Sequence, residues 1–177
     1  MNKKRSSDLV IDASVARASG GNSAAHPTAA HTRDFLQAVL TICHKAVMTS
    51  AVRDEWDAHQ SYFARKWRSS MLARKKLKLL KVDEQQNLRR RIESEVTSDA
   101  KKAAMLKDCH LIEAALATDR RIIALDNSAR QLFSEASSNI SEMQCIIWID
   151  PVDDADRVID WLNGAPDQAK WYLKAPE

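Results

Sequence analysis

Four acidic side chains in this sequence could share one site, namely Asp12, Glu55, Asp108 and Asp126. Asp12 and Asp126 each follow an apolar run that is typical of a buried strand, and ligands of parallel sheets bind at the carboxyl ends of strands. Glu55 lies on a predicted helix just after the second strand. Asp108 lies on the apolar side of a later helix, where a carboxylate is costly to bury unless it is paired or bound to a cation. Because neighbouring carboxylates repel one another and hard oxygen ligands suit Mg²⁺ or Mn²⁺ better than Zn²⁺, we expect a Mg²⁺ or Mn²⁺ site.

Each of these acids also has an ordinary structural interpretation. Asp12 could simply end its strand, since Asp is common at strand ends and turns. Asp126 could cap the helix that begins directly after it. Asp54 and Asp57 lie on the same predicted helix as Glu55, which we prefer because its apolar neighbours place it beside the buried face.

The elements that must position these acids alternate between strands and helices. This order favours a single α/β domain with a parallel sheet and helices on its faces. A loop is expected at 18–26, and the last dozen residues are expected to be a surface tail, although Trp171 and Tyr172 could dock. The apolar patterns predict strands at 8–15, 46–49, 121–125 and 145–149, and helices at 27–44, 50–60, 61–80, 82–95, 98–118, 127–136 and 152–162.

Length and composition exclude several other classes of protein. The 177 residues fit one domain, and no stretch approaches the roughly 18 apolar residues of a membrane span. The three cysteines, Cys43, Cys109 and Cys145, are too far apart to indicate a disulfide framework or a zinc site, and are expected to be reduced in the cytoplasm.

His110 is one residue beyond Asp108 and is expected to face elsewhere, because one helical step turns it by about 100°.

The segment from residue 61 to residue 92 is strongly basic. It carries eleven Lys or Arg against two acids, a net charge of +9, while the rest of the chain has a net charge of −6. One interpretation is an ordinary solvated face. A second is a docking surface for a dimer or an acidic protein, formed by Phe63, Trp67 and Met71. A third is a phosphate track that steers RNA, for which the candidate residues are Arg65, Arg68, Arg74, Lys75 and Lys78.

Three motifs around the acids resemble those of PIN-domain nucleases, closest to the VapC-like toxins. Asp12-Ala-Ser-Val resembles their opening Asp-x-Ser, and the stretch from Met48 to Glu55-Trp resembles their strand–helix element with its Glu. The stretch from Lys107-Asp108 to Ala115, followed by Ile122 to Asp126, resembles their Asp-x-x-x-x-x-Ala helix and the strand that ends at their last Asp. The likeness covers about residues 8–150, which leaves a C-terminal helix and tail at 151–177. This chain has Ala124 where many members have Thr or Ser.

The resemblance implies a single three-layer α/β domain, with a central parallel sheet of four to five strands flanked by helices and a basic helical insertion at about 61–95. It also implies metal-assisted hydrolysis of RNA phosphodiester bonds, with a metal-activated water attacking in line. Asp12, Asp108 and Asp126 would be direct or water-mediated ligands, and Glu55 would be a ligand or orient the water. Ser14 would hydrogen-bond a carboxylate or a water of the metal.

Three hypotheses for function follow. The first is a metal-dependent endoribonuclease, the toxin of a bacterial toxin–antitoxin pair, with RNA as substrate and an antitoxin or a second copy as partner. The second is a binding module with the same fold and weak or no nuclease activity, which holds nucleic acid or protein through its basic helices. The third is a DNA-processing or flap-type nuclease that shares the metal chemistry.

Overall fold

A five-stranded parallel sheet forms the centre of the structure, a computed structural model that describes residues 6–20, 26–153 and 155–175. The strand order is β3-β2-β1-β4-β5, and every pairing is parallel. The predicted α/β class and parallel sheet of four to five strands are therefore confirmed. The strands are β1 (Asp8–Ile11), β2 (Lys45–Met48), β3 (Leu77–Leu79), β4 (Arg121–Ile123) and β5 (Ile147–Ile149).

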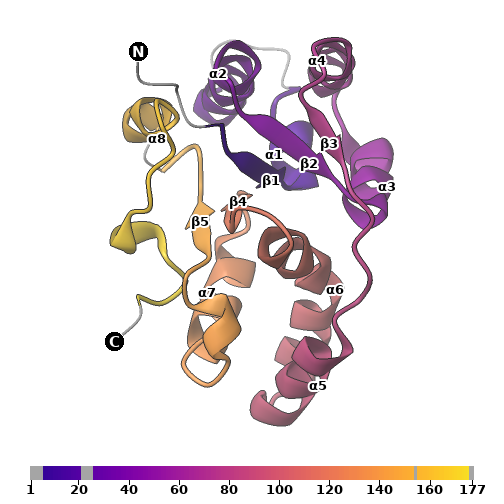
Figure 1. Ribbon diagram of the computed structural model, residues 1–177, viewed down its shortest axis with the longest axis vertical. Coiled ribbons are helices and arrows are strands. Elements are labelled where there is room, and N and C mark those ends of the chain that lie inside the picture. Colours follow the sequence, from indigo (N-terminus) through magenta and orange to yellow (C-terminus); the bar gives the residue numbers. More distant parts are fainter. Residues whose placement is uncertain (1–5, 21–25, 154, 176–177) are drawn as a thin grey trace.

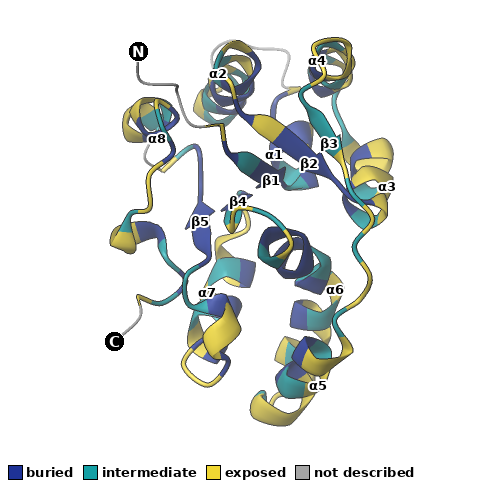
Figure 2. Ribbon diagram, in the orientation of Figure 1, coloured by how far each residue is buried: buried dark blue, intermediate teal, exposed yellow. Residues whose placement is uncertain are grey.

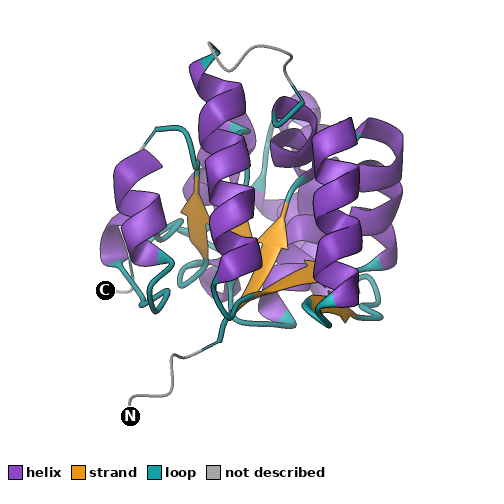
Figure 3. Cartoon of the chain, turned by 90° about the horizontal axis from the view of Figure 1, so that it is seen from above, coloured by secondary structure: helices purple, strands orange, loops and turns teal. Residues whose placement is uncertain are grey.

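Helices cover both faces of the sheet and make three layers (Figures 1 and 3). The first face carries α2 (Pro27–Thr41), α4 (Tyr62–Ala73) and α8 (Ala155–Trp161). The other face carries α5 (Gln86–Glu95), α6 (Asp99–Leu116) and α7 (Asn127–Ala136). Two further helices, α1 (Ala13–Ala18) and α3 (Ser50–His59), pack against each other. Within the described residues, no helix combines the length and apolar composition needed to cross a bilayer.

Burial on both faces explains why the central strands read as continuous apolar runs. Leu9 to Ile11 of β1 and Ile122 and Ile123 of β4 are almost fully shielded from solvent (Figure 2). Residues Trp67 and Met71 of α4 are also buried, and the Trp67 ring stacks on Trp56 with centroids 5.7 Å apart. The interpretation of this helix as a docking surface is therefore wrong for Trp67 and Met71, because both belong to the core, and Phe63 packs partly buried against it.

The helix expected at 61–80 is wrong in its second half. The α4 helix ends at Ala73, and Lys75 adopts a left-handed backbone with φ of 57°. The Lys75 and Lys76 amides then donate to the carbonyls of Leu72 and Met71, which is the pattern of a Schellman helix end. The chain next enters β3, so the basic segment contributes a strand to the sheet and is not an all-helical insertion.

Other element ends differ from the predictions by a few residues. The first strand stops at Ile11 because Asp12 caps α1, and Thr49 caps α3. On α6, Leu111, Ile112 and Ala115 are buried, whereas Ala104 is exposed. Most of the loop expected at 18–26 falls on residues 21–25, which lie outside the described residues.

The C-terminal segment docks on the domain through Trp171 and Tyr172, the alternative that the sequence left open beside a surface tail. Trp171 is buried edge-to-face against Trp161, with ring centroids 5.6 Å apart. Tyr172 forms an antiparallel bridge with Ile147, the first residue of β5. The three cysteines are free thiols, as expected.

Candidate functional site

The strand order creates a crevice at the carboxyl edge of the sheet. From β1 the chain builds outward through β2 and β3, then returns to the other side of β1 for β4 and β5. The connection that leaves β1 therefore runs toward β2 on one side, and the connection that leaves the neighbouring β4 runs toward β5 on the other side. Open α/β sheets bind ligands at such a reversal of strand order. Asp12 follows β1 at this point, and its amide donates to the carbonyl of Ile123 at 2.9 Å. Asp126 follows β4 after two further residues.

Asp12 and Asp126 both cap helices, so the ordinary interpretation of Asp126 as a cap is confirmed. The Oδ2 atom of Asp12 accepts from the Ser14 amide at 3.0 Å, and the Oδ1 atom of Asp126 accepts from the Ala129 amide at 2.8 Å. Each cap uses one carboxylate oxygen. The second oxygen of each has no protein donor within the described part of the chain, so capping leaves both acids able to hold a ligand.

Ser14 ties the two strand ends together. Its Oγ accepts a hydrogen bond from the Leu125 amide at 3.1 Å, so the start of α1 is fixed against the residue before Asp126. The hydroxyl proton remains available for a second bond. The expected contact from this hydroxyl to a carboxylate is not formed; instead Ser14 holds the backbone that carries Asp126.

Glu55 is brought to the same edge by its neighbour on α3. The indole Nε1 of Trp56 donates to the carbonyl of Ile11 at 2.8 Å, which anchors this turn of α3 next to Asp12. The Oε2 atom of Glu55 lies 3.3 Å from Nε2 of His110, although the two are not aligned as a hydrogen bond. The prediction that His110 faces elsewhere is therefore wrong, because it lies beside Glu55.

Asp108 enters the site from α6. Burial raises the pKa of its carboxyl above the ordinary value, and the nearby charges of Asp126 and Asp12 raise that pKa further. The positive charge of Lys107 acts in the opposite direction. A carboxyl whose pKa rises because of two like charges and burial is one whose ionised form a bound cation would stabilise.

All four predicted acids line one pocket of about 200 Å³. Within the described residues, no three acidic, histidine or cysteine side chains converge tightly enough to form a ready-made metal cage. Mg²⁺ does not require one, since it keeps several waters and binds through one or two carboxylates. The donor set therefore fits a hard divalent cation held loosely. The remaining lining residues are Ala13, Ser14, Arg17, His59 and Lys107.

Three basic residues of this lining were missed in the sequence, namely Arg17, His59 and Lys107. His59 lies four residues after Glu55 on α3, so helical spacing could have identified it. Lys107 directly precedes Asp108. Arg17 carries no local signal, because its place depends on how α1 packs. The site thus combines four carboxylates with the cations of Arg17 and Lys107 and the imidazole of His59.

The basic segment does not line this pocket. Arg68 pairs with Asp57 at 2.6 Å, and Arg74 donates to the carbonyl of Leu40 at 3.3 Å. Lys78 pairs with Asp8, the first residue of β1. Arg65 and Lys75 are exposed.

Part of this basic segment lies at the amino-terminal ends of the strands, on the side of the sheet away from its carboxyl edge. Arg74 and Lys75 come just before β3, and Leu40 comes just before β2, so both basic residues are at the amino ends of the strands. Arg74 and Lys75 are therefore opposite the acids, and none of the five residues of the predicted phosphate track lines the acidic pocket.

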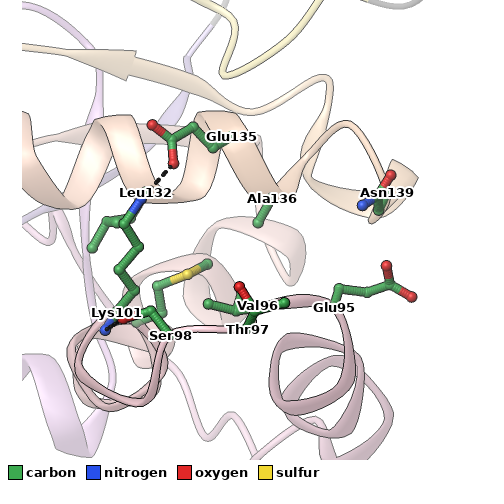
Figure 4. A pocket seen from close by; sticks show the side chains of 10 residues that line it. Glu95, Val96, Thr97, Ser98, Lys101, Leu132, Glu135, Ala136 and Asn139 are labelled. Carbon is green, nitrogen blue, oxygen red and sulfur yellow. Dashed lines mark hydrogen bonds and ion pairs between the residues drawn. The ribbon is translucent and has the colours of Figure 1, made fainter.

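Another pocket, of about 170 Å³, lies between α7 and the junction of α5 and α6 (Figure 4). Its charged lining consists of Glu95, Lys101 and Glu135, and the last two pair with each other at 3.1 Å. No cluster of free carboxylates forms there, so the chemistry is better placed at the carboxyl edge.

The fold and the site together define a three-layer α/β protein with an acidic pocket at the point where its strand order reverses. Comparisons with protein-family models, with curated proteins and with solved structures found no match.

Proposed function

We propose that this chain is a divalent-metal-dependent endoribonuclease of the PIN-domain type, acting as the toxin of a bacterial toxin–antitoxin pair. One observation carries the proposal. Asp12, Glu55, Asp108 and Asp126 are up to 114 positions apart in the sequence, yet they line a single pocket. Four carboxylates gathered at the ligand-binding edge of a parallel sheet suit a hard cation and a phosphodiester substrate.

Each acid has a separate role in this proposal. Asp12, Asp108 and Asp126 would hold the cation, and Glu55 would complete the ligand set or orient the attacking water. When bound, the cation supplies Lewis-acid polarisation of the phosphoryl oxygen and lowers the pKa of a water. Ser14 keeps Asp126 in register with Asp12 through the Leu125 amide. Lys107 and Arg17 bring positive charge to a pocket that would otherwise repel a polyanion.

The biological part of the proposal concerns partners and location. RNA is the proposed substrate, an antitoxin or a second copy of the chain is the proposed partner, and the cytoplasm is the proposed compartment. The free thiols of Cys43, Cys109 and Cys145 suit a reducing compartment.

A binding module without strong nuclease activity is the second candidate, and specific observations favour it. Asp12 and Asp126 have structural work as helix caps, and Glu55 has a partner in His110. Buried Ala124 offers no hydroxyl where many PIN domains have one. A DNA nuclease with the same metal chemistry is a third candidate.

Thermal unfolding with and without Mn²⁺ tests the proposal. The wild type should gain melting temperature with Mn²⁺ and cleave single-stranded RNA only when the metal is present. Asp12→Asn and Asp108→Asn should lose both effects, while Asp83→Asn, an exposed residue outside the pocket, should keep them.

The outcomes separate the three candidates. RNA binding with no Mn²⁺ shift would favour the binding module. Equal or faster cleavage of DNA of the same sequence would favour the third candidate. Metal-dependent cleavage that persists in both Asn variants would reject the metal site.

A further inference from the structure

A second hollow continues the acidic pocket along the carboxyl edge of the sheet. It has a volume of about 440 Å³ and extends from the end of α1 to the start of α7. Ser14, Arg17 and Asp126 line both pockets. Because the two pockets share this wall, they form one trough, in which the acidic pocket is one end. The other residues of the second pocket are Ala18, Leu125, Asn127 and Ser128.

The two ends of the trough differ in charge. The acidic pocket holds four carboxylates against two cations, Arg17 and Lys107, whereas the second pocket holds one carboxylate, Asp126, and one cation, Arg17. The amide nitrogen of Asn127 is already directed away to Asp150, at 3.2 Å. Arg17 is therefore the main positive group available to an anion in the second pocket.

Arg17 is exposed and has no ion pair or side-chain hydrogen bond with any described residue. Asp12 and Asp126 line pockets that Arg17 also lines, yet the guanidinium pairs with neither. An unpaired guanidinium has a fork of donors that matches the oxygens of a phosphate. A trough with four carboxylates at one end and a free guanidinium on the wall that both pockets share suits a ligand with two successive phosphates.

We propose that a single strand of nucleic acid crosses both pockets, with the reacting phosphodiester at the carboxylates and the neighbouring phosphate held by Arg17. This inference rests on the proposed function and adds to it the path and class of the substrate. It also assigns the phosphate contact to the trough rather than to the basic segment at 61–92, whose residues Arg74 and Lys75 lie at the opposite edge of the sheet.

The lining of the trough also limits how the strand is recognised. Among the described residues, no Phe, Tyr or Trp lines either pocket, so bases have no large stacking platform there, and the aromatic contribution is limited to the His59 imidazole at the acidic end. Contacts to phosphates position a nucleic acid without reading its sequence. A flexible single strand can bend its backbone into a trough between helices, whereas a duplex holds its phosphates on a rigid path. The substrate class is therefore a single strand with weak sequence selection at these two positions.

Fluorescence anisotropy with a short labelled single-stranded RNA in Ca²⁺ tests the inference. Arg17→Gln should weaken binding about fivefold, and the slope of log affinity against log salt should fall by about 0.7, the value for one phosphate contact on a single strand. Arg17→Lys should restore part of the affinity. Lys75→Gln, which removes an exposed cation at the other edge, should bind like the wild type. A duplex of the same sequence should bind at least about tenfold more weakly.

The Mn²⁺ shift in melting temperature separates this inference from the proposed function. If the wild type shows no shift, the proposed metal site fails and this inference falls with it. Suppose instead that Mn²⁺ raises the melting temperature of the wild type and of Arg17→Gln equally. If the two proteins then also bind RNA with the same affinity and the same salt slope, only the phosphate contact assigned to Arg17 is overturned, and the metal site stands. Equal binding of duplex and single strand overturns the substrate class. An equal loss in Lys75→Gln returns the phosphate contact to the basic segment.

Discussion

The Ser14 hydroxyl accepts a hydrogen bond from the Leu125 amide at 3.1 Å, across 111 positions of the sequence. This bond joins the helix that follows β1 to the segment that leads from β4 to Asp126. Because Asp12 caps the same helix, the distance between two of the proposed metal ligands depends on it. Ser14→Ala should therefore lower the free energy of unfolding by about 1 kcal/mol, since a partly buried amide loses its acceptor.

Urea unfolding measures this loss, and the Mn²⁺ concentration for half-maximal stabilisation should rise in the same variant. Ser69→Ala is the matched control, because the Ser69 hydroxyl is exposed and bonds only to the Arg65 carbonyl within its own helix. That control should change stability by less than about 0.5 kcal/mol. Equal losses in the two variants would show that Ser14 has no special positioning role.

Asp108→Asn should stabilise the metal-free protein. Burial and the charges of Asp126 and Asp12 raise the pKa of Asp108, so its ionised form destabilises the folded state at neutral pH. This penalty is present above the folded-state pKa and absent below the ordinary value of 3.8. We expect the melting temperature at pH 7 to rise by about 1–3 °C without metal, and the gain to disappear in acid. A lower melting temperature at pH 7, with Asp83→Asn unchanged, would contradict the repulsion.

The protein should lose stability as the pH falls below 6.5, and His44 is the reason. Its Nδ1 accepts from the Ser7 amide at 3.0 Å, and its Nε2 donates to the Leu162 carbonyl at 2.6 Å, so the neutral ring satisfies both partners. Burial lowers the pKa of His44, and the positive charges of Lys76 and Arg121 lower it further. The Leu162 carbonyl and the charge of Asp119 raise this pKa, but the lowering effects are larger. The unfolded state thus binds the proton first, and stability falls from pH 6.5 down to the folded-state pKa.

Unfolding in urea between pH 7.5 and 5.5 measures this loss, which one proton limits to about 1.4 kcal/mol per pH unit. His44→Gln should be less stable at pH 7.5 but flatter across the range. His26→Gln, which changes an exposed residue, should follow the wild type. A wild-type stability that does not change across this range would reject the assignment.

Glu113 should be the most sensitive charged residue outside the site. Arg89 binds both of its oxygens, at 2.8 and 2.9 Å, and the Gln85 amide donates at 2.8 Å. Burial alone would raise the pKa of Glu113, but these donors outweigh it and the pKa lies below its ordinary value. The stabilisation is therefore present above pH 4.5 and is lost as the pH falls through the folded-state pKa.

Glu113→Leu should cost about 3 kcal/mol, because the partly buried Arg89 would lose its two closest acceptor oxygens and keep Glu84 at 3.7 Å and the Leu106 carbonyl at 3.5 Å. The double variant with Arg89→Met should recover much of this loss, as measured by urea unfolding. Glu135→Gln, at an exposed ion pair with Lys101, should leave stability nearly unchanged. A double variant as unstable as the single one would mean that packing, not charge, dominates here.

The sequence was sufficient to predict four of the five strands and the grouping of the acids, because these depend on local patterns. Apolar runs that end at Asp12 and Asp126 indicate strands and their carboxyl ends, and the alternation with helices makes the strands parallel. Asp108 was recognisable because a carboxylate on an apolar helix face needs a partner. The grouping of these acids in one pocket follows from that geometry.

The errors arise where long-range packing decides the structure. Lys75 adopts a left-handed conformation that Gly usually marks, so nothing in the sequence announced the end of α4 or the start of β3. Arg17 joins the site through the packing of a short helix, and Arg74 is held by the end of α2. A sum of charges along the chain could not reveal that these basic residues lie at different edges of the sheet.

The position of β1 in the middle of the sheet has a consequence during synthesis of the chain. β1 can pair with β2 as soon as residue 48 has left the ribosome, but its other edge stays open until residues 121–123 have been made. Asp126 emerges after that. A partly made chain therefore carries an unpaired inner strand and an incomplete pocket, so any activity of this edge appears only when the second half of the sheet has closed on the first.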